Sequence, residues 1–231
     1  MKVLLINGQN HKGSTYHLRR MLAEKLAPAE DIDEIFLPRD LPQFCCGCGT
    51  CFMDDEKKCP HYKYVAPLTE KLDAADVLIF ATPVYVYHAT GSMKAFLDHY
   101  AYRWMLHRPE EKMFSKQAVV LATCAGAGIR TACRDVADSC FYWGIPKIYT
   151  WGESVYAQKW EHVKPSRIRA MERKTDELAR TIKKNQGCVK PDIKTRGFFR
   201  LTRVMHRFNW MDSDVKYWHD RGWDKKVRPW K

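Results

Sequence analysis

The sequence predicts a single α/β domain, built on a doubly wound five-stranded parallel sheet with helices on both faces, and a basic aromatic C-terminal extension. Short apolar runs alternate five times with segments of helical periodicity over about 185 residues. Two of these runs, 76–83 and 117–123, are apolar almost throughout, as expected of parallel strands that helices cover on both faces. The chain has 231 residues, 45% of them hydrophobic, which is enough for one substantial core.

The first half of the domain contains two strands, two helices and a long loop. Residues 2–7 form an apolar strand that ends at Gly8, and Ser14 opens a helix. The helix is indicated by four apolar residues at helical spacing, Leu18, Met21, Leu22 and Leu26. The second strand is expected at 34–37, after which a cysteine-rich loop leads to a short helix at 68–72.

The second half alternates in the same way. A helix at 92–104 follows the third strand, a helix at 129–142 follows the fourth, and a last short strand lies at 146–151. A long charged helix at 164–184 then closes the pattern, and we expect Pro165-Ser166 to cap it.

The domain is expected to end near Gly187, which gives a sheet domain at 1–187 and an extension at 188–231. The extension carries most of the net charge of +12, since residues 183–231 contain 14 Lys and Arg against 5 Asp and Glu. Partners inferred from charge therefore concern this extension rather than the fold. No apolar run approaches the length of a bilayer span, and no cleavage site follows Met1-Lys2, so we expect a cytoplasmic protein.

Loops at the carboxyl ends of parallel strands bind ligands in such sheets. The first of them, 8–15, has small residues, two hydroxyls and a following helix start, which suits an anion. It matches neither the P-loop pattern nor the dinucleotide fingerprint. The alternative is that Ser14 only caps the helix. After the third strand, Tyr85 and Tyr87 lie where a flat aromatic ligand could rest, although they could equally be ordinary core or interface residues.

Four segments, KVLLINGQNHKGST, CCGCGTC, ADVLIFATPVYVY and GSMKAFLDHY, occur in this order. Together they resemble the NADPH-dependent FMN reductase and iron–sulfur flavoprotein family, which has the flavodoxin-like fold. The resemblance covers about residues 1–150 and implies FMN as cofactor, NAD(P)H as co-substrate and a homodimer. It further implies that the first loop holds the FMN phosphate, with His11 standing where the family has an arginine. The residues implied to bind FMN are Gln9, His11, Ser14, Thr15, Pro83, Val84, Tyr85, Val86, Thr123 and Gly126.

Five of the nine cysteines lie between residues 44 and 60. Four of them have the compact spacing that iron–sulfur clusters and zinc both use, and they match the cysteine motif of the iron–sulfur flavoproteins. These are Cys45, Cys48, Cys51 and Cys59. Relatives with the same spacing also exist whose cysteines hold nothing, so a four-iron four-sulfur cluster, zinc and free thiols remain three open interpretations. Placed in chain order, the loop is expected beside the flavin pocket.

The extension shows helical spacing of its apolar residues Phe198, Leu201, Met205 and Phe208, with four arginines on other sides. Four tryptophans follow, at positions 210, 218, 223 and 230. We expect this segment to pack on its own body or on a partner subunit and to bury those aromatics. Contact with nucleic acid or a membrane is the less favoured alternative.

These features predict an FMN-dependent oxidoreductase that passes electrons from NAD(P)H through the flavin to a quinone, flavin, metal or other acceptor, small molecule or protein. In such chemistry the flavin reacts, and no side chain has to act as catalytic nucleophile. The alternative is a non-enzymatic flavin and iron–sulfur electron carrier between partner proteins. Carriers of this fold tend to be acidic, whereas this body is near neutral.

Overall fold

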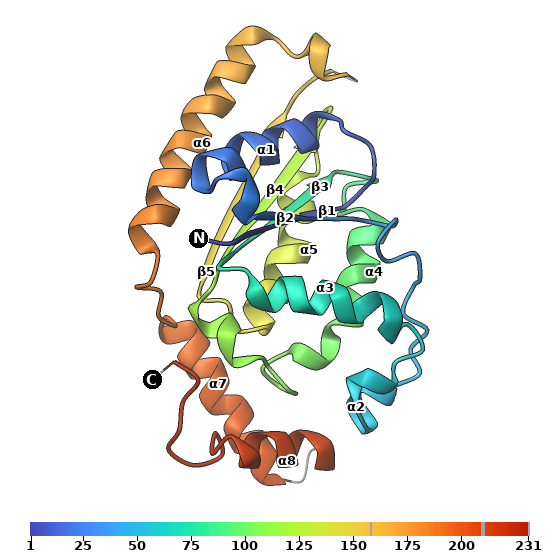
Figure 1. Ribbon diagram of the computed structural model, residues 1–231, viewed down its shortest axis with the longest axis vertical. Coiled ribbons are helices and arrows are strands. Elements are labelled where there is room, and N and C mark those ends of the chain that lie inside the picture. The colour runs from blue at the N-terminus through green and yellow to red at the C-terminus, as the bar shows by residue number, and fades with distance from the viewer. Residues whose placement is uncertain (158, 209–210, 231) are drawn as a thin grey trace.

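Five parallel strands form one sheet in the order β2-β1-β3-β4-β5, in a computed structural model that describes residues 1–157, 159–208 and 211–230 (Figure 1). The strands are β1 (Val3–Asn7), β2 (Ile32–Phe36), β3 (Val77–Pro83), β4 (Gln117–Cys124) and β5 (Lys147–Ser154). Every residue of β1 and β4 is buried, which explains their continuous apolar sequence. The predicted doubly wound, flavodoxin-like sheet is therefore confirmed.

Helices cover both faces of this sheet. One face carries α1 (Ser14–Leu26) and α6 (Pro165–Asn185), and the other carries α3 (Tyr62–Ala74), α4 (Gly91–His99) and α5 (Ile129–Tyr142). Successive residues of a strand point to opposite faces, so Leu4 joins one core and Leu5 the other. Short helical segments occur at Thr50–Met53 (α2), Ala29–Asp31, Glu56–Lys58, Ala101–Arg103, Glu111–Ser115 and Trp160–His162.

Several boundaries differ from the prediction. Helix α3 begins at Tyr62, six residues early, because its first turns lie in the polar sequence that periodicity assigned to the cysteine loop. Helix α4 ends at His99, and a 3-10 turn replaces its expected last residues. The cap predicted for α6 is wrong: Lys164 is its N-cap, no side chain caps it, and Pro165 occupies the first turn, where a missing N–H costs nothing.

The C-terminal extension forms α7 (Ile193–Met205), a 3-10 turn (His206–Phe208) and α8 (Asp212–Asp220) at one end of the molecule (Figure 1). Its side chains Phe199, Trp218 and Trp223 form a third core with Met105 and Phe114 of the body. Trp218 Nε1 also donates a hydrogen bond to the backbone oxygen of His107, at 2.6 Å. The extension is thus packed on its own body along these contacts.

The predicted apolar side of α7 is wrong in detail. Leu201 and Phe208 are exposed, while the neighbouring Phe199 is fully buried against the tryptophans. Trp210, which the sequence placed among the buried aromatics, lies outside the described residues. The division at residue 187 remains a prediction. Within the described ranges, no helix combines the length and apolarity that crossing a bilayer requires.

Candidate functional site

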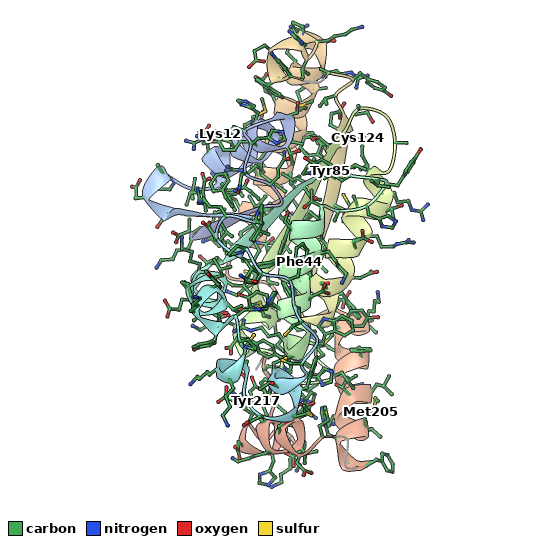
Figure 2. The ribbon with its side chains drawn as sticks, turned by 90° about the vertical axis from the view of Figure 1, so that its right-hand side faces the viewer. Lys12, Phe44, Tyr85, Cys124, Met205 and Tyr217 are labelled. Carbon is green, nitrogen blue, oxygen red and sulfur yellow. The ribbon has the colours of Figure 1, made fainter. Side chains whose placement is uncertain are left out.

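The loops that follow β1, β3 and β4 meet at one end of the sheet, where Figure 2 shows Lys12, Tyr85 and Cys124. Strands β1 and β3 are neighbours, yet the chain leaves them toward opposite sides, to α1 and to α4. This is the topological switch point, where a doubly wound sheet leaves a crevice for a ligand.

Gly8 fixes the start of the first loop. Its N–H donates to the backbone oxygen of Ala81 at 2.8 Å, and its own oxygen accepts from the hydroxyls of Thr90 at 2.7 Å and Ser92 at 2.6 Å. A Cβ atom at this position would lie 2.8 Å from Thr90 Oγ1, so a larger residue would clash. The loop is thereby tied to the start of α4.

The N-terminus of α1 has the properties of an anion site. Gly13 is the N-cap residue and no side chain caps the helix, so Ser14 is not a capping residue and the helix's first N–H groups stay free for an external acceptor. The first turn contains no acidic residue. His11 and Lys12 lie exposed just before it. These donors suit a dianionic phosphate such as that of FMN.

Two hydrogen bonds connect the predicted binding residues across loops. Tyr85 Oη donates to Gln9 Oε1 at 2.6 Å, and the Gln9 amide nitrogen lies 3.0 Å from His11 Nε2. The hydroxyls of Thr15 and Thr123 lie 2.5 Å apart and are buried, which ties α1 to the end of β4. Thr15 is therefore buried with a protein partner, whereas His11 is exposed at the entrance of the loop.

Residues 84–88 form a tight hairpin turn with unusual backbone geometry. Tyr85 and His88 exchange two backbone hydrogen bonds of 3.0 Å, and the two residues between them, Val86 and Tyr87, have φ values of 49° and 66°. Non-glycine residues in this region are strained, a β-branched valine above all, and such strain concentrates at ligand sites. The turn packs on Gly128, where a Cβ would lie 2.7 Å from Val84 Cγ1.

The third loop leaves its backbone open. A Cβ on Gly126 would meet no atom within 4 Å, so a flat ligand could approach this backbone closely. Pro83 and Val84 are half-buried beside it, and the Val84 N–H donates to the Thr123 oxygen at 2.9 Å. The predicted residues of the second and third loops thus lie together.

Two residues of this region were missed by sequence reasoning. Thr90 is the N-cap of α4, since its hydroxyl oxygen accepts from Met93 N–H at 3.2 Å while the hydroxyl donates to Gly8. A threonine directly before the Gly91-Ser92 helix start is a recognisable capping signal. Asp135 lies 3.1 Å from His88 Nδ1, a contact between α5 and the hairpin that no local pattern indicates.

The cysteine loop surrounds a separate cavity of about 300 Å³. All five of its thiols line that cavity, namely Cys45, Cys46, Cys48, Cys51 and Cys59. Within the described residues, no three His, Cys, Asp or Glu side chains are assembled in a metal-binding geometry. Asp98 and His99 at the end of α4 also line the cavity, whereas Gly8 contacts the start of α4. The thiols thus lie at the end of α4 that is remote from Gly8, and the expectation that they lie beside the flavin stays a prediction.

The cavity wall contains thiols of different character and a fixed histidine pair. Burial raises the pKa of Cys51 to about 11 and also raises the pKa of Cys59, whereas the Thr50 hydroxyl lowers the pKa of Cys48. His99 Nδ1 donates to the backbone oxygen of Ala95 at 2.7 Å, so its Nε2 accepts from His61 Nδ1 at 2.9 Å. The pair is thereby held in one tautomeric arrangement, and both rings line the cavity.

The C-terminal extension holds this loop in place. The buried Arg108 donates to the backbone oxygens of Cys51 and, at 3.1 Å, Asp54. Its guanidinium lies 3.9 Å from the buried carboxylate of Asp214 in α8, and Ser213 donates to the backbone oxygen of Phe52 at 2.5 Å. Ser213 thus contacts the cysteine loop directly, and Asp214 contacts it through Arg108, both within residues 51–54.

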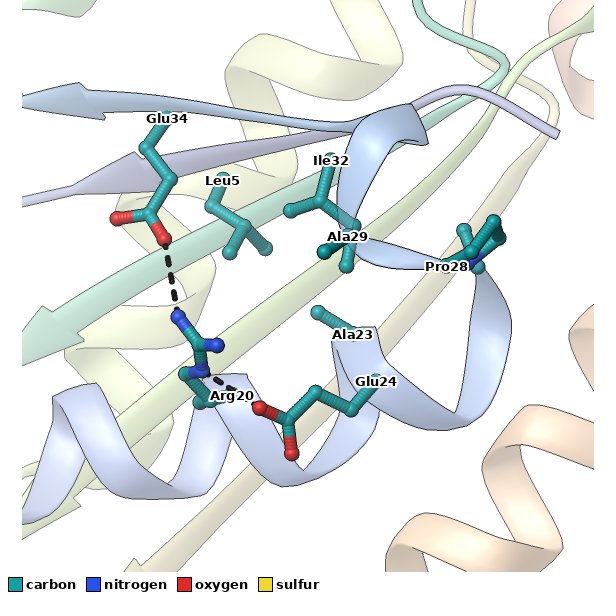
Figure 3. Close-up of a pocket in the computed structure, with 9 residues that line it drawn as sticks. Leu5, Arg20, Ala23, Glu24, Pro28, Ala29, Ile32 and Glu34 are labelled. Atoms are coloured by element: carbon teal, nitrogen blue, oxygen red, sulfur yellow. Dashed lines mark hydrogen bonds and ion pairs between the residues drawn. The ribbon is translucent and has the colours of Figure 1, made fainter.

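Another cavity, of about 230 Å³, lies between α1 and β2 (Figure 3). Its charged side chains are already paired, since Arg20 lies 2.6 Å from Glu24 and 3.7 Å from Glu34. It is distant in the fold from the carboxyl ends of the strands, and we do not regard it as the functional site.

Comparison with known proteins adds three findings. The family model for NADPH-dependent FMN reductase matches residues 1–157. Two proteins of Archaeoglobus fulgidus described as iron-sulfur flavoproteins are 31% identical over 99 residues and 30% identical over 101 residues, covering 42% of this chain and 48% and 42% of their own lengths. The match thus spans less than half of each of these relatives.

The fold is also found in a solved structure. The FMN-dependent NADH-azoreductase from Bacillus anthracis in complex with FMN aligns with a TM-score of 0.55 and 12% identity, over 78% of this chain and 100% of that one. At this identity the likeness shows the fold alone.

Proposed function

Because the chain belongs to the NADPH-dependent FMN reductase family, we propose that it is an FMN-dependent NAD(P)H oxidoreductase. It passes electrons from reduced nicotinamide through FMN to a quinone, flavin, metal or other acceptor. The observation that carries this proposal is the convergence of an uncapped helix N-terminus, a strained aromatic hairpin and an open glycine loop at one switch point.

The chain's own residues bind and orient the cofactor. The free N–H groups of α1, with Ser14 and His11, would hold the phosphate, and the hydrogen bond between Tyr85 and Gln9 fixes the hairpin over the first loop. Pro83, Val84 and Val86 would contact the flavin ring, and the open backbone at Gly126 would be available to its polar groups. Thr15 and Thr123 support the site by joining its loops. FMN, when bound, supplies the hydride and single-electron chemistry.

A pair of matched variants tests the phosphate site. Ser14→Asp places a negative charge at the N-terminus of α1, and we expect it to weaken FMN binding by roughly tenfold or more. Riboflavin, which lacks the phosphate, should be affected far less. Ser166→Asp makes the same change in the first turn of α6 and should leave FMN binding unchanged. Equal affinity of wild type and Ser14→Asp for FMN would contradict the assignment.

Anaerobic spectroscopy separates the enzyme from an electron carrier. The purified protein should show flavin absorption bands. In the absence of oxygen, NADH or NADPH should bleach these bands on the timescale of catalytic turnover. Bound FMN that neither nucleotide reduces would instead support a non-enzymatic carrier. A colourless chain that takes up no FMN would contradict both functions.

We further propose that the cysteine cavity holds a four-iron four-sulfur cluster. The convergence of five thiols on one cavity supports this. Since no three candidate ligands are assembled among the described residues, the loop would have to rearrange to bind the cluster. Iron and acid-labile sulfide assays on anaerobically reconstituted protein should give about four of each per chain. Less than one iron per chain would exclude the cluster, and a zinc assay would then decide between zinc and free thiols.

A homodimer also belongs to the proposal. Sedimentation equilibrium of the flavin-loaded protein should give twice the mass of 27.1 kDa. A concentration-independent monomer would contradict it.

A further inference from the structure

Helix α7 and the 3-10 turn that continues it (His206–Phe208) present sides of different composition, because an α-helix completes a turn every 3.6 residues. One side is buried against the body and consists of Thr195, Phe199, Thr202 and His206. The opposite side is apolar but exposed and consists of Ile193, Leu201, Val204 and Phe208. Ile193 is 90% exposed and Phe208 is 79% exposed. Packing on the body thus accounts for the buried side of the helix but not for its exposed apolar side.

Between these two sides runs a column of arginines, Arg196, Arg200, Arg203 and Arg207. Residues 193–208 contain no Asp or Glu. In the part of the chain that the structure describes, none of the four arginines takes part in an ion pair. Among the described residues, the column thus carries positive charge that no carboxylate compensates by an ion pair.

The segment 225–228 extends this cationic surface. Arg203 donates to the backbone oxygen of Lys225 at 3.0 Å, which holds the segment against α7. Burial, and then the positive charges of Arg203 and Arg200, lower the pKa of Arg228. Like charges are thus gathered here against their mutual repulsion, and an anionic partner would relieve that repulsion.

Two kinds of partner fit this surface poorly. A second copy of the same face would set arginines against arginines, since a two-fold interface pairs a surface with itself. Nucleic acid would accept the arginines but leave Ile193, Leu201 and Val204 without suitable contacts. An anionic bilayer accepts both kinds of side chain, because apolar residues enter the headgroup boundary while guanidinium groups meet lipid phosphates.

We propose that this outer face of α7, formed by its exposed apolar and arginine sides together with segment 225–228, docks on an anionic lipid membrane surface. The helix lies in the interface and does not span the bilayer. The buried side keeps α7 attached to the body at the same time, so packing and membrane contact use different sides of one helix.

Vesicle co-sedimentation of the full chain tests this proposal. We expect the protein to bind phosphatidylcholine vesicles that contain about one third phosphatidylglycerol, and not vesicles of phosphatidylcholine alone. Salt at about 0.5 M should weaken the binding, because it screens the arginines. The triple variant R196Q/R200Q/R207Q and the double variant L201S/F208S should each reduce the bound fraction by roughly tenfold or more.

The matched control is R169Q/R173Q, which removes exposed arginines from α6 and should bind like wild type. All these changes affect exposed side chains, so thermal unfolding should be the same in every variant. Equal binding to neutral and anionic vesicles, or wild-type binding by the triple variant, would overturn the proposal. If L201S/F208S had a smaller solution mass than wild type, the face would instead bind a second copy of the chain. If the protein retained duplex DNA but did not bind vesicles, the face would instead bind nucleic acid.

Discussion

His11 stands where the resemblance to the FMN reductase family leads us to expect an arginine. Its ring lies beside Gly13, with Nε2 2.8 Å from the position that a Cβ there would take, and it contacts the neutral amide of Gln9. A guanidinium offers a phosphate several charge-assisted donors in a fixed plane, which an imidazole does not. The site therefore relies mainly on the helix N–H groups and on the exposed Lys12 for charge compensation.

Replacing His11 by arginine should strengthen FMN binding. A charge-assisted hydrogen bond to the phosphate should lower the dissociation constant by roughly fivefold or more. Fluorescence titration measures this, and riboflavin serves as the control ligand because it has no phosphate to gain from the change. An equal gain for riboflavin would mean that the arginine acts on the ring rather than on the phosphate.

His206 gives the extension a pH dependence. Burial is the largest cause and lowers the pKa of this histidine, the charge of His107 lowers it further, and Asp214 opposes both. The unfolded chain, with an ordinary histidine pKa of about 6.5, then takes up the proton first as the pH falls. Stability is thus complete above that value and is lost as the pH falls through it.

We expect the free energy of unfolding to decrease between about pH 7.5 and 5.5, with a contribution from His206 of at most ~1.4 kcal/mol per pH unit. His206→Asn should flatten this dependence, whereas His219→Asn, at an exposed position of α8, should not. Urea unfolding at several pH values measures both. Parallel curves for wild type and His206→Asn would show that another group is responsible.

Among the elements, α8 has the most specific task, because it fixes the cysteine loop through Ser213 and Asp214. Ser213→Ala removes one hydrogen bond to Phe52 and should cost about 1 kcal/mol. Hydrogen exchange of the backbone amides at 50–59 should become faster. Thr181→Ala, which removes a similar hydroxyl-to-carbonyl bond from α6, is the control and should leave these amides unchanged.

The elements also show what a sequence can predict here. Strands β3 and β4 were recognised because burial on both faces imposes a continuous apolar sequence. The buried side of α7 was assigned one residue off, since Phe198 and Phe199 are adjacent and only the tryptophans of α8 and beyond decide which of them is covered. Long-range contacts such as Arg108 to Cys51 leave no local pattern and could not be predicted.

The functional site was likewise predictable only in part. Its loops were predictable, because parallel topology brings the ends of β1, β3 and β4 together. The roles of individual side chains were harder to predict. The Thr15 hydroxyl forms a hydrogen bond with the Thr123 hydroxyl, and the cysteine cavity lies at the far end of α4. Both facts depend on how separate segments pack, which residue spacing does not encode.

At the scale of the whole molecule, the shared core of body and extension predicts that they unfold together. Phe199→Ala should cost about 3–5 kcal/mol, because Phe199 is fully buried between Phe114 and Trp218. Phe208→Ala makes the same change at an exposed position and should cost less than about 0.5 kcal/mol. Urea unfolding followed by tryptophan fluorescence and by far-UV circular dichroism measures both.

The two signals should change in one coincident transition. Two separate transitions would show instead that the residues after 187 form an independently stable unit. They would also show that the third core contributes little to the stability of the sheet domain.

The contacts between α8 and the cysteine loop form late during synthesis of the chain. Ser213 is separated from Phe52 by 161 positions. A ribosome that adds about 5–20 residues per second therefore completes the cysteine loop roughly ten seconds or more before it completes α8. During that interval Arg108 can already bind the loop, but the contacts from Ser213 and Asp214 are still missing. A cofactor could therefore enter the cavity in one of two ways. It is inserted into the nascent loop before α8 has been made, or it is inserted later, when α8 already contacts the loop and restricts access to the cavity.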